Sequence, residues 1–236
     1  GIRKVTARDQ VEFDSHEMEA GGLTLVRRAR FAEFALDQQT GRAEARGPGS
    51  VTVWKQGRGN RASLSPVAVA RANRAANARD TKWEYTRIDF ANEMVAKTKL
   101  RTISFIGQVQ VVYGPVKEPL EVIDLDNLPK DGGAMYCDTL EFTQRTTVTD
   151  DKYVELLARD NARLEGRSFS AQAYAITFDE SKGLYTLRSK GDQQAMLWRE
   201  HAPGLPRTPV VAKTFMFNPA RNFVDFDNAS LVRGLQ

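Results

Sequence analysis

Several features that mark particular classes of protein are scarce or missing in this sequence. Among its 236 residues there are one cysteine, Cys137, and two histidines, His16 and His201. A single cysteine excludes an internal disulfide and a CxxC metal site, and a free cysteine is usually a small core residue. The two histidines are far apart and lack the clustered spacing of zinc ligands. We therefore expect no metal site.

Long hydrophobic runs are also missing. The strongest candidate, Ile103–Tyr113, is interrupted by Ser104, Gly107 and two glutamines, and a membrane-spanning helix needs roughly 20 apolar residues. No signal peptide is visible at the start, and no initiator methionine is present, so we interpret the chain as a fragment. The 41% hydrophobic and 27% charged residues are typical of a globular protein, and a net charge of +4 suits an anionic partner without requiring one.

The common catalytic motifs are missing as well. There is no G-x-S-x-G, P-loop or H-E-x-x-H sequence. Gly57-Arg58-Gly59 is not followed by a reliable helix, so it does not predict a phosphate-binding loop. The paired carboxylates fall in expected loops, where they are usually solvated. We predict a protein that is not an enzyme and has no cofactor.

What the sequence does contain is a series of short strands separated by turn residues about every 8–12 positions, which predicts an all-β fold with roughly 14–18 strands. Ser50–Trp54 alternates with a period of two, and Gly107 indicates a bulge. Tyr153–Leu164 has partial helical spacing, but the neighbouring residues favour a strand. No long helix is available to build a βαβ unit.

Two stretches depart from this pattern. Arg61–Asp80 is rich in alanine and arginine and predicts either a short helix over Val67–Ala78 or a long loop. Gly114–Gly133 contains three prolines and predicts an excursion with one short strand at Leu120–Leu125. The chain thus forms one elongated β domain over 1–236, or two tandem halves, 1–60 and 81–236, separated by an insertion at 61–80.

One short unit recurs along the chain. Ile176-Thr177-Phe178-Asp179 is followed by Gly183, and Phe34-Ala35-Leu36-Asp37 is followed at the same distance by Gly41. Phe215-Met216-Phe217-Asn218 followed by Asn222 is a third copy. Aspartate can accept hydrogen bonds from its own turn, and glycine supplies a positive φ. Such self-similarity is typical of a repeat architecture.

The copies share an apolar face, because their first and third residues are bulky and the intervening ones are mostly polar. A sheet that covers an interior on one side has this pattern. The lining candidates are Phe13, Phe34, Leu36, Phe90, Phe105, Val109, Val111, Leu140, Phe142, Ile176, Phe178, Phe215 and Phe217. They predict either a packed core or the wall of an apolar groove between two sheet faces. The alternation of bulky and polar residues alone does not distinguish the two.

The turn and strand pattern of Ile176–Asp192 resembles that of OstA-like domains, which belong to lipopolysaccharide-transport proteins. Phe105–Val111 resembles the F-x-G-N-V-x-V strand pair of that family, and Met135–Phe142 resembles the strand that follows it. The resemblance implies a stacked antiparallel β-jelly roll, or β-taco, in the periplasm. It also implies a groove that binds the acyl chains of a lipopolysaccharide-type glycolipid, and end-to-end pairing of edge strands with other OstA-like domains.

Basic residues supply the remaining expectations. Burial of an acyl chain gains about 0.8 kcal/mol per methylene, whereas a phosphorylated headgroup needs a basic rim. The rim candidates are Arg27, Arg28, Arg30, Arg46, Lys55 and Arg58. Their alternative role is a solvated face that discourages aggregation.

Two other functions stay open: a β scaffold that recruits partners through its edge strands, and, less favoured, nucleic-acid binding by the arginines between Arg58 and Arg79. That stretch has no aromatic residue to stack on bases. We predict a protein peripheral to membranes, without a nucleic-acid partner.

Overall fold

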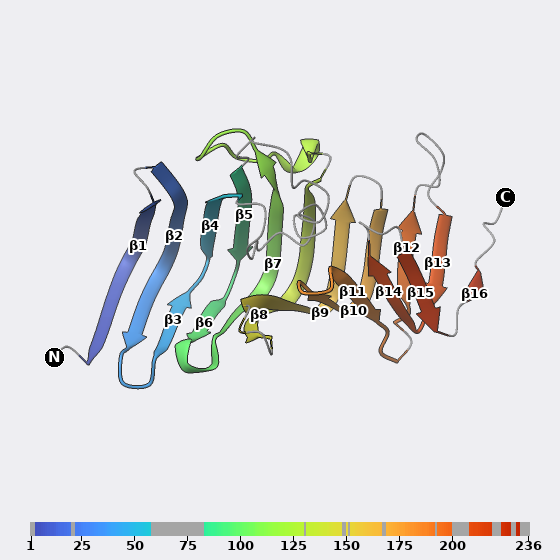
Figure 1. The fold of residues 1–236 in the computed structure, drawn as a ribbon. Coiled ribbons are helices and arrows are strands. Elements are labelled where there is room, and N and C mark those ends of the chain that lie inside the picture. The colour runs from blue at the N-terminus through green and yellow to red at the C-terminus, as the bar shows by residue number, and fades with distance from the viewer. Residues whose placement is uncertain are drawn as a thin grey trace.

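A computed structural model shows the chain as a single long antiparallel sheet that runs from the N-terminal to the C-terminal end (Figure 1). It describes residues 3–19, 22–57, 83–129, 131–147, 150, 152–166, 169–191, 193–199, 208–218, 223–227 and 230–231. The strands stand side by side in nearly chain order (Figure 1). The all-β prediction is confirmed, and the 16 strands of the sheet lie within the predicted range.

The first strands are β1 (Lys4–Glu19), β2 (Gly22–Asp37), β3 (Arg42–Arg46), β4 (Gly49–Gln56), β5 (Trp83–Phe90), β6 (Glu93–Lys97), β7 (Thr102–Val116) and β8 (Gly133–Thr146). The others are β9 (Lys152–Gly166), β10 (Phe169–Asp179), β11 (Leu184–Arg188), β12 (Ala195–Arg199), β13 (Thr208–Ala212), β14 (Thr214–Asn218), β15 (Phe223–Asp227) and β16 (Ser230–Leu231). Two single-turn 3₁₀ helices, η1 (Thr98–Leu100) and η2 (Leu125–Asn127), complete the described elements. No helix among the described residues is long and apolar enough to cross a membrane.

We call one pass of the chain across the sheet, made of one long strand or of two short strands in succession, a leg. Each leg is interrupted near its middle, and we call this point the corner; β1 has a second register shift, between Glu17 and Met18. In long strands the corner is a shift of register, between Ile106 and Val109 where β7 pairs with β8. In shorter ones it separates two named strands, as Gly47-Pro48 does between β3 and β4. Every leg therefore contributes one segment to each of two half-sheets, which is the geometry of a folded, taco-like sheet.

The two half-sheets are defined by their pairing. The upper half-sheet contains residues 11–19 of β1, 22–30 of β2, β4, β5, 109–116 of β7, 133–137 of β8, 162–166 of β9, 169–173 of β10, β12, β13 and β16. The lower half-sheet contains residues 4–8 of β1, 33–37 of β2, β3, β6, 102–106 of β7, 139–146 of β8, 152–159 of β9, 175–179 of β10, β11, β14 and β15.

The corners are built by residues that tolerate a left-handed backbone. Gly107 has a φ of 88°, and Asp160 and Asn161 have φ values of 61° and 57°. Aspartate and asparagine adopt this conformation more readily than other side chains. The Asn161 side-chain amide also donates a 2.8 Å hydrogen bond to Asp138, which lies at the corner of the neighbouring leg. This hydrogen bond connects two adjacent corners. The predicted bulge at Gly107 is confirmed by the register shift between Ile106 and Val109.

The main core lies between the half-sheets. Leu140, Ile176 and Phe215 from the lower half-sheet join Met135, Leu164 and Leu197 from the upper one in a single buried cluster. Because side chains alternate along a strand, one face of each half-sheet points into this interior and the other points out. The interior is apolar, as the shared parity of the repeated units predicts.

A smaller second core lies on the outer face of the upper half-sheet. Residues 117–129 fold back over this face, where Trp54 and Tyr85 pack with Ile123. The Trp54 indole donates a 2.7 Å hydrogen bond to the carbonyl of Glu121. The predicted strand at Leu120–Leu125 is wrong, because this segment forms no strand pairing and instead covers the sheet with its side chains before the η2 turn.

The structure can also be compared with the predictions for β9, for the repeated unit and for residues 67–78. Tyr153–Leu164 lies in β9, so the strand prediction is confirmed. The three copies of the repeated unit occupy equivalent places, at the ends of β2, β10 and β14 in the lower half-sheet. The Asp37 carboxylate accepts hydrogen bonds from Gln39 and Thr40, as its turn role predicts. The predicted helix or loop at 67–78 lies outside the described residues.

Candidate functional site

A continuous row of phenylalanine rings lies inside the fold along the corner of its N-terminal half. We call it the phenylalanine ladder: Phe13, Phe34, Phe31, Phe90, Phe105 and Phe142, with consecutive ring centroids 4.9, 6.1, 6.1, 5.5 and 6.2 Å apart. Distances between 4.5 and 7 Å are those of favourable aromatic contacts. The ladder ends at the edge strand β1, where Phe13 remains 43% exposed.

We call the edge of the interior farthest from the corner, between the two half-sheets, the mouth. In the N-terminal half, the mouth is lined by small or half-exposed side chains. On the lower half-sheet the inward-facing positions farthest from the corner include Ala43 and Ala96, both only partly buried. Val5 and Ile103 are 39% and 40% exposed at the two ends of this row. Apolar interior surface is therefore accessible from the mouth and from the β1 edge.

The C-terminal half is closed at the same distance from the corner. We call the residues that close it the aromatic seal: Tyr113 and Phe169 from the upper half-sheet, and Phe178, Tyr185 and Phe217 from the lower one. The Phe169 and Phe217 rings meet edge to face at 4.9 Å across the interior, and Phe178 packs on Tyr185 at 4.7 Å. These rings join the two half-sheets, so the interior is a filled core here.

The seal contains two hydroxyl groups buried without an ordinary hydrogen bond. Tyr113 and Tyr185 are 2% and 0% exposed, and neither hydroxyl has a hydrogen-bond partner of normal geometry in the described part of the chain. They are close enough for each to influence the pKa of the other, but burial dominates. It raises the pKa of Tyr113 from its usual 10 to about 12 and that of Tyr185 well above 10.

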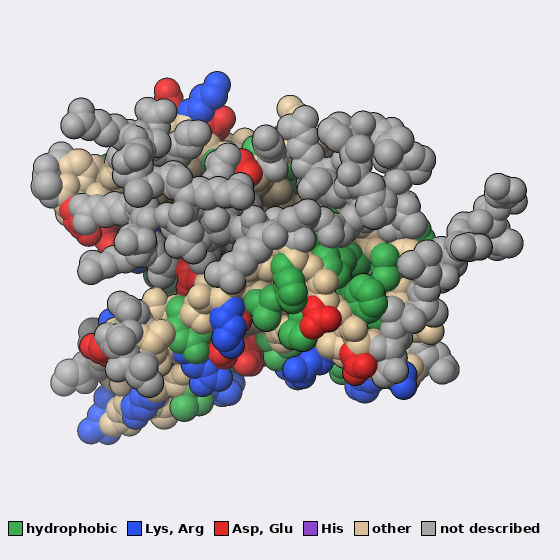
Figure 2. All heavy atoms as spheres, turned by 45° about the vertical axis from the view of Figure 1, so that its right-hand side comes forward, with side chains coloured by type: hydrophobic (Ala, Val, Ile, Leu, Met, Phe, Trp, Pro, Cys, Tyr) green, Lys and Arg blue, Asp and Glu red, His purple; other side chains and the backbone are tan. Residues whose placement is uncertain are grey.

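The structure places every predicted lining residue on the inner face, but in two environments. Phe13, Phe34 and Leu36 line the accessible N-terminal end. The others are at most 8% exposed and pack in the main core: Phe90, Phe105, Val109, Val111, Leu140, Phe142, Ile176, Phe178, Phe215 and Phe217. The predicted lining residues are thus mostly part of the packed core, and those that remain partly exposed lie at the N-terminal end. In the view of Figure 2, hydrophobic side chains are exposed above a lower edge where Lys and Arg side chains lie among Asp and Glu.

The predicted basic rim is divided between the two faces. By its register, Arg27 lies on the inner face of the upper half-sheet, where its guanidinium is 2.6 Å from the Glu17 carboxylate. Lys55 lies on the same face at the neighbouring position of β4. Arg46 is on the outer face of the lower half-sheet, 3.7 Å from Glu33. Arg58 lies outside the described residues.

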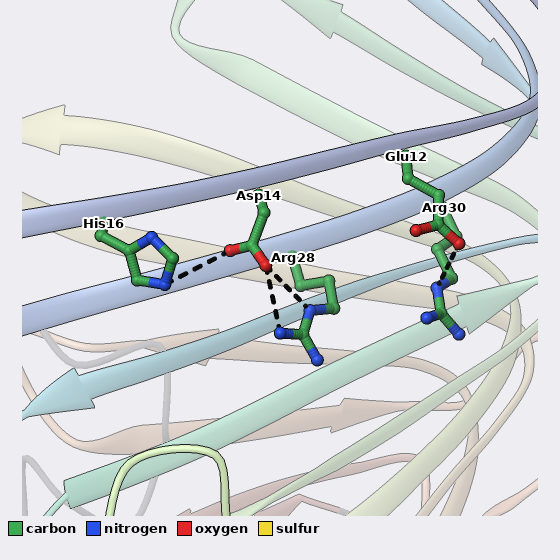
Figure 3. Close-up of polar contacts among 5 residues, drawn as sticks. All are labelled: Glu12, Asp14, His16, Arg28 and Arg30. Carbon is green, nitrogen blue, oxygen red and sulfur yellow. Dashed lines mark hydrogen bonds and ion pairs between the residues drawn. The ribbon is translucent and has the colours of Figure 1, made fainter.

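The two remaining arginines, Arg28 and Arg30, project from the outer face of β2 toward acidic side chains of β1 (Figure 3). Arg30 is 3.0 Å from Glu12. Arg28 is 3.1 Å from Asp14, which also lies 3.5 Å from His16. The Arg28 guanidinium is stacked over Trp54 as well. These arginines form ion pairs between β2 and β1 and are turned away from the interior.

Sequence reasoning missed the seal residues Tyr113, Phe169 and Tyr185. Their contacts join legs that are far apart in the sequence, so period-two parity within one strand gives no signal of them. The second core was also missed, although Trp54 lies on the otherwise polar face of its strand and this was a usable signal.

The polar chemistry of the described residues is limited. No group of three or more His, Cys, Asp or Glu side chains there is arranged to hold a metal ion. Cys137 is buried, which raises the pKa of its thiol from 9 to about 12 and leaves it unreactive at neutral pH.

Comparison with known proteins assigns the chain to no family. No protein-family model matches it, and no curated protein matches it. A function is therefore inferred from the residues of this chain and their geometry.

Proposed function

We propose that the protein binds acyl chains of a lipid in the N-terminal half of its interior and passes them along an envelope transport bridge. The observation that carries this proposal is the accessible end of the phenylalanine ladder, where Phe13 is 43% exposed and the small mouth residues Ala43 and Ala96 are only partly buried. Each buried methylene of a bound tail contributes about 0.8 kcal/mol. A continuous apolar wall is the surface that such a tail needs.

The charged rim supports a lipid with an anionic headgroup. Arg27 and Lys55 lie on the inner face of the upper half-sheet, beyond the apolar rows. A tail on the ladder would place its headgroup near them. The resemblance to OstA-like domains supports a glycolipid of lipopolysaccharide type and a periplasmic location, and both form part of the proposal.

A substitution on one strand tests the groove. Ala96 faces the interior from β6, and Val95 faces outward beside it. A phenyl ring at Ala96 would displace at least two methylenes of a bound tail, so Ala96→Phe should weaken binding of a fluorescent fatty acid by at least about tenfold. Val95→Phe, the matched control, should bind as the parent does. Equal binding by all three proteins, measured by fluorescence titration, would reject the groove as the site.

Native mass spectrometry tests the class of lipid separately. The protein is mixed with purified lipopolysaccharide or with a phospholipid of equal tail length. We expect a one-to-one complex with lipopolysaccharide that Ala96→Phe reduces. A complex with the phospholipid alone would retain acyl binding but remove the glycolipid from the proposal.

A second function is favoured by the edge strand β1. Among the described residues β1 pairs only with β2, and most of its 16 residues are exposed. Such an edge recruits another strand by backbone hydrogen bonding, which fits a scaffold joined end to end to another β domain. Concentration-dependent association in sedimentation velocity, lost in Phe13→Lys through an inward-facing charge, is the expected result. A monomer at all concentrations would remove self-association through β1.

A further inference from the structure

Two hairpin turns from distant parts of the sequence are locked together at the lower edge of the sheet. Residues 38–41 join β2 to β3, and residues 98–101 join β6 to β7, and both loops protrude side by side at the bottom of Figure 1. The backbone N–H of Thr98 donates a 2.9 Å hydrogen bond to the carbonyl of Gly41, and its hydroxyl donates one of 3.0 Å. Lys99 also donates to the carbonyl of Gln39 at 3.0 Å. We call residues 38–41 and 97–101 the paired tip.

The paired tip is rich in positive charge. Lys97, Lys99 and Arg101 are exposed, and no ion pair joins them to a carboxylate within the described residues. The nearby acidic groups are already engaged: Glu44 with Arg42, and Glu155 with Arg145 at 2.9 Å. Asp37 accepts hydrogen bonds from its own turn. The tip therefore carries an uncompensated positive surface.

A large apolar side chain stands in the middle of these cations. Leu100 is 64% exposed, the most of any large hydrophobic residue in the described part of the chain. Its backbone is fixed by the η1 turn, by Arg101 in a left-handed conformation with a φ of 52°, and by the hydrogen bonds to Gly41. An exposed leucine on a rigid loop between cations is unfavourable in water and favourable where apolar and anionic groups occur together.

We propose that the paired tip is a docking site for the surface of an anionic lipid bilayer. Leu100 inserts at the boundary between headgroups and acyl chains, while Lys97, Lys99 and Arg101 contact lipid phosphates. Apolar burial and attraction to anionic lipids are the two contributions that drive interfacial binding. The leucine distinguishes a bilayer from a nucleic acid, whose phosphate backbone gains nothing from an exposed aliphatic side chain.

Docking by the tip would bring the accessible interior close to the membrane. Ile103, which follows the tip in β7, is one of the half-exposed residues of the mouth. The bilayer inference does not depend on lipid uptake, because vesicle binding and fatty-acid titration are measured separately. Loss of vesicle binding with fatty-acid binding retained would reject the docking site alone. Loss of fatty-acid binding with vesicle binding retained would reject the proposed groove alone.

The test is vesicle co-sedimentation of the full chain. Vesicles of phosphatidylcholine alone are compared with vesicles in which about one third of the lipid is phosphatidylglycerol. We expect binding to the anionic vesicles only, weakened by added salt because surface charges are screened. Lys97→Gln with Arg101→Asn should weaken it about fivefold for each cation removed. Leu100→Ser alone should weaken it about tenfold.

A matched control separates the tip from net charge. Lys117→Gln, Val122→Ser and Arg188→Gln together remove two exposed cations and a side chain that is 61% exposed, all away from the tip. This variant should bind vesicles as the parent protein does. Unchanged binding in the tip variants, or an equal loss in the control, would overturn the proposal. So would a DNA duplex that displaces the vesicles while Leu100→Ser has no effect.

Discussion

The two halves of the interior are built from the same strand pattern, yet one is filled and the other is accessible. In the C-terminal half, bulky rings from both half-sheets meet at the mouth and close it. In the N-terminal half, the equivalent row contains Val5, Leu36, Ala43, Ala96 and Ile103, which are at least partly exposed and not aromatic. Aromatic rings in the row farthest from the corner therefore fill the interior of one half, whereas the aliphatic side chains of the other half stay accessible.

This difference means that the two halves contribute unequally to stability. Close packing in the sealed half supplies stability, because removing buried atoms leaves cavities that cost free energy. The N-terminal half has less of this packing, because more of its inward-facing side chains are partly exposed. Large side chains in this row of the N-terminal half would fill its interior. Small side chains in the same row of the C-terminal half would make its interior accessible.

The largest expected contrast is between matched phenylalanine substitutions. Phe178 in the seal is 4% exposed, and Phe13 at the open end is 43% exposed. Phe178→Ala should lower the free energy of unfolding by about 3–5 kcal/mol through loss of burial and formation of a cavity. Phe13→Ala should lower it by about 1 kcal/mol. Urea denaturation measures both, and equal losses would remove the distinction between the halves.

Alkaline pH provides a second way to probe the seal. The pKa of Tyr113 is raised to about 12 in the folded state, from 10. An unfolded chain thus loses this proton first, so stability is retained below pH 10 and falls between pH 10 and 12. The loss is about 3 kcal/mol for this group.

Tyr113→Phe tests this loss directly. It should make the stability profile less steep over that range when unfolding is followed by circular dichroism. Part of the slope remains, because the pKa of the Cys137 thiol is raised from 9 to about 12 and burial also raises the pKa of Tyr185. A profile identical to that of the parent would show that Tyr113 is hydrated.

Substitutions at the corners of the two halves should differ less in the free energy of unfolding that they cost. A Cβ on Gly107 would lie 2.5 Å from side-chain atoms of Asn92, and the φ of 88° adds strain. Gly107→Ala should cost about 1–2 kcal/mol. Asn161→Gly at a C-terminal corner loses one hydrogen bond but fits its φ of 57°, so it should cost less than about 1 kcal/mol. Thermal unfolding measures both losses. A larger loss for Asn161→Gly than for Gly107→Ala would contradict this account.

The smallest effect is expected at the ion pairs that hold β1. The side chains of Arg30 and Glu12 are 62% and 64% exposed, so their pair is screened by solvent. Arg30→Ala should change the free energy of unfolding by only a few tenths of a kcal/mol. Arg28→Ala should cost somewhat more, because Arg28 also stacks over Trp54. A loss above about 1 kcal/mol at Arg30 would mean that the edge depends on charge rather than on backbone pairing.

The sequence was sufficient to predict the fold class and the face that points inward. Bulky residues such as Phe34, Ile176 and Phe215 occur at every second position next to turn residues. Both patterns can be recognised within a few consecutive residues. The seal depends on which rings meet across the interior, and Tyr113 and Tyr185 are brought together only by the corner in every leg. Residues 117–129 were misread at Leu120–Leu125 because an apolar segment that covers a sheet has the composition of a strand.

The corner in every leg has a consequence for the dimensions of the molecule. Each leg closes its own bend with local residues, and neighbouring strands lie about 4.8 Å apart. Adding or deleting one hairpin would therefore change the length of the interior by about 10 Å while leaving its cross-section intact. The number of hairpins therefore sets the length of the interior, independently of the side chains that decide how tightly each segment is packed.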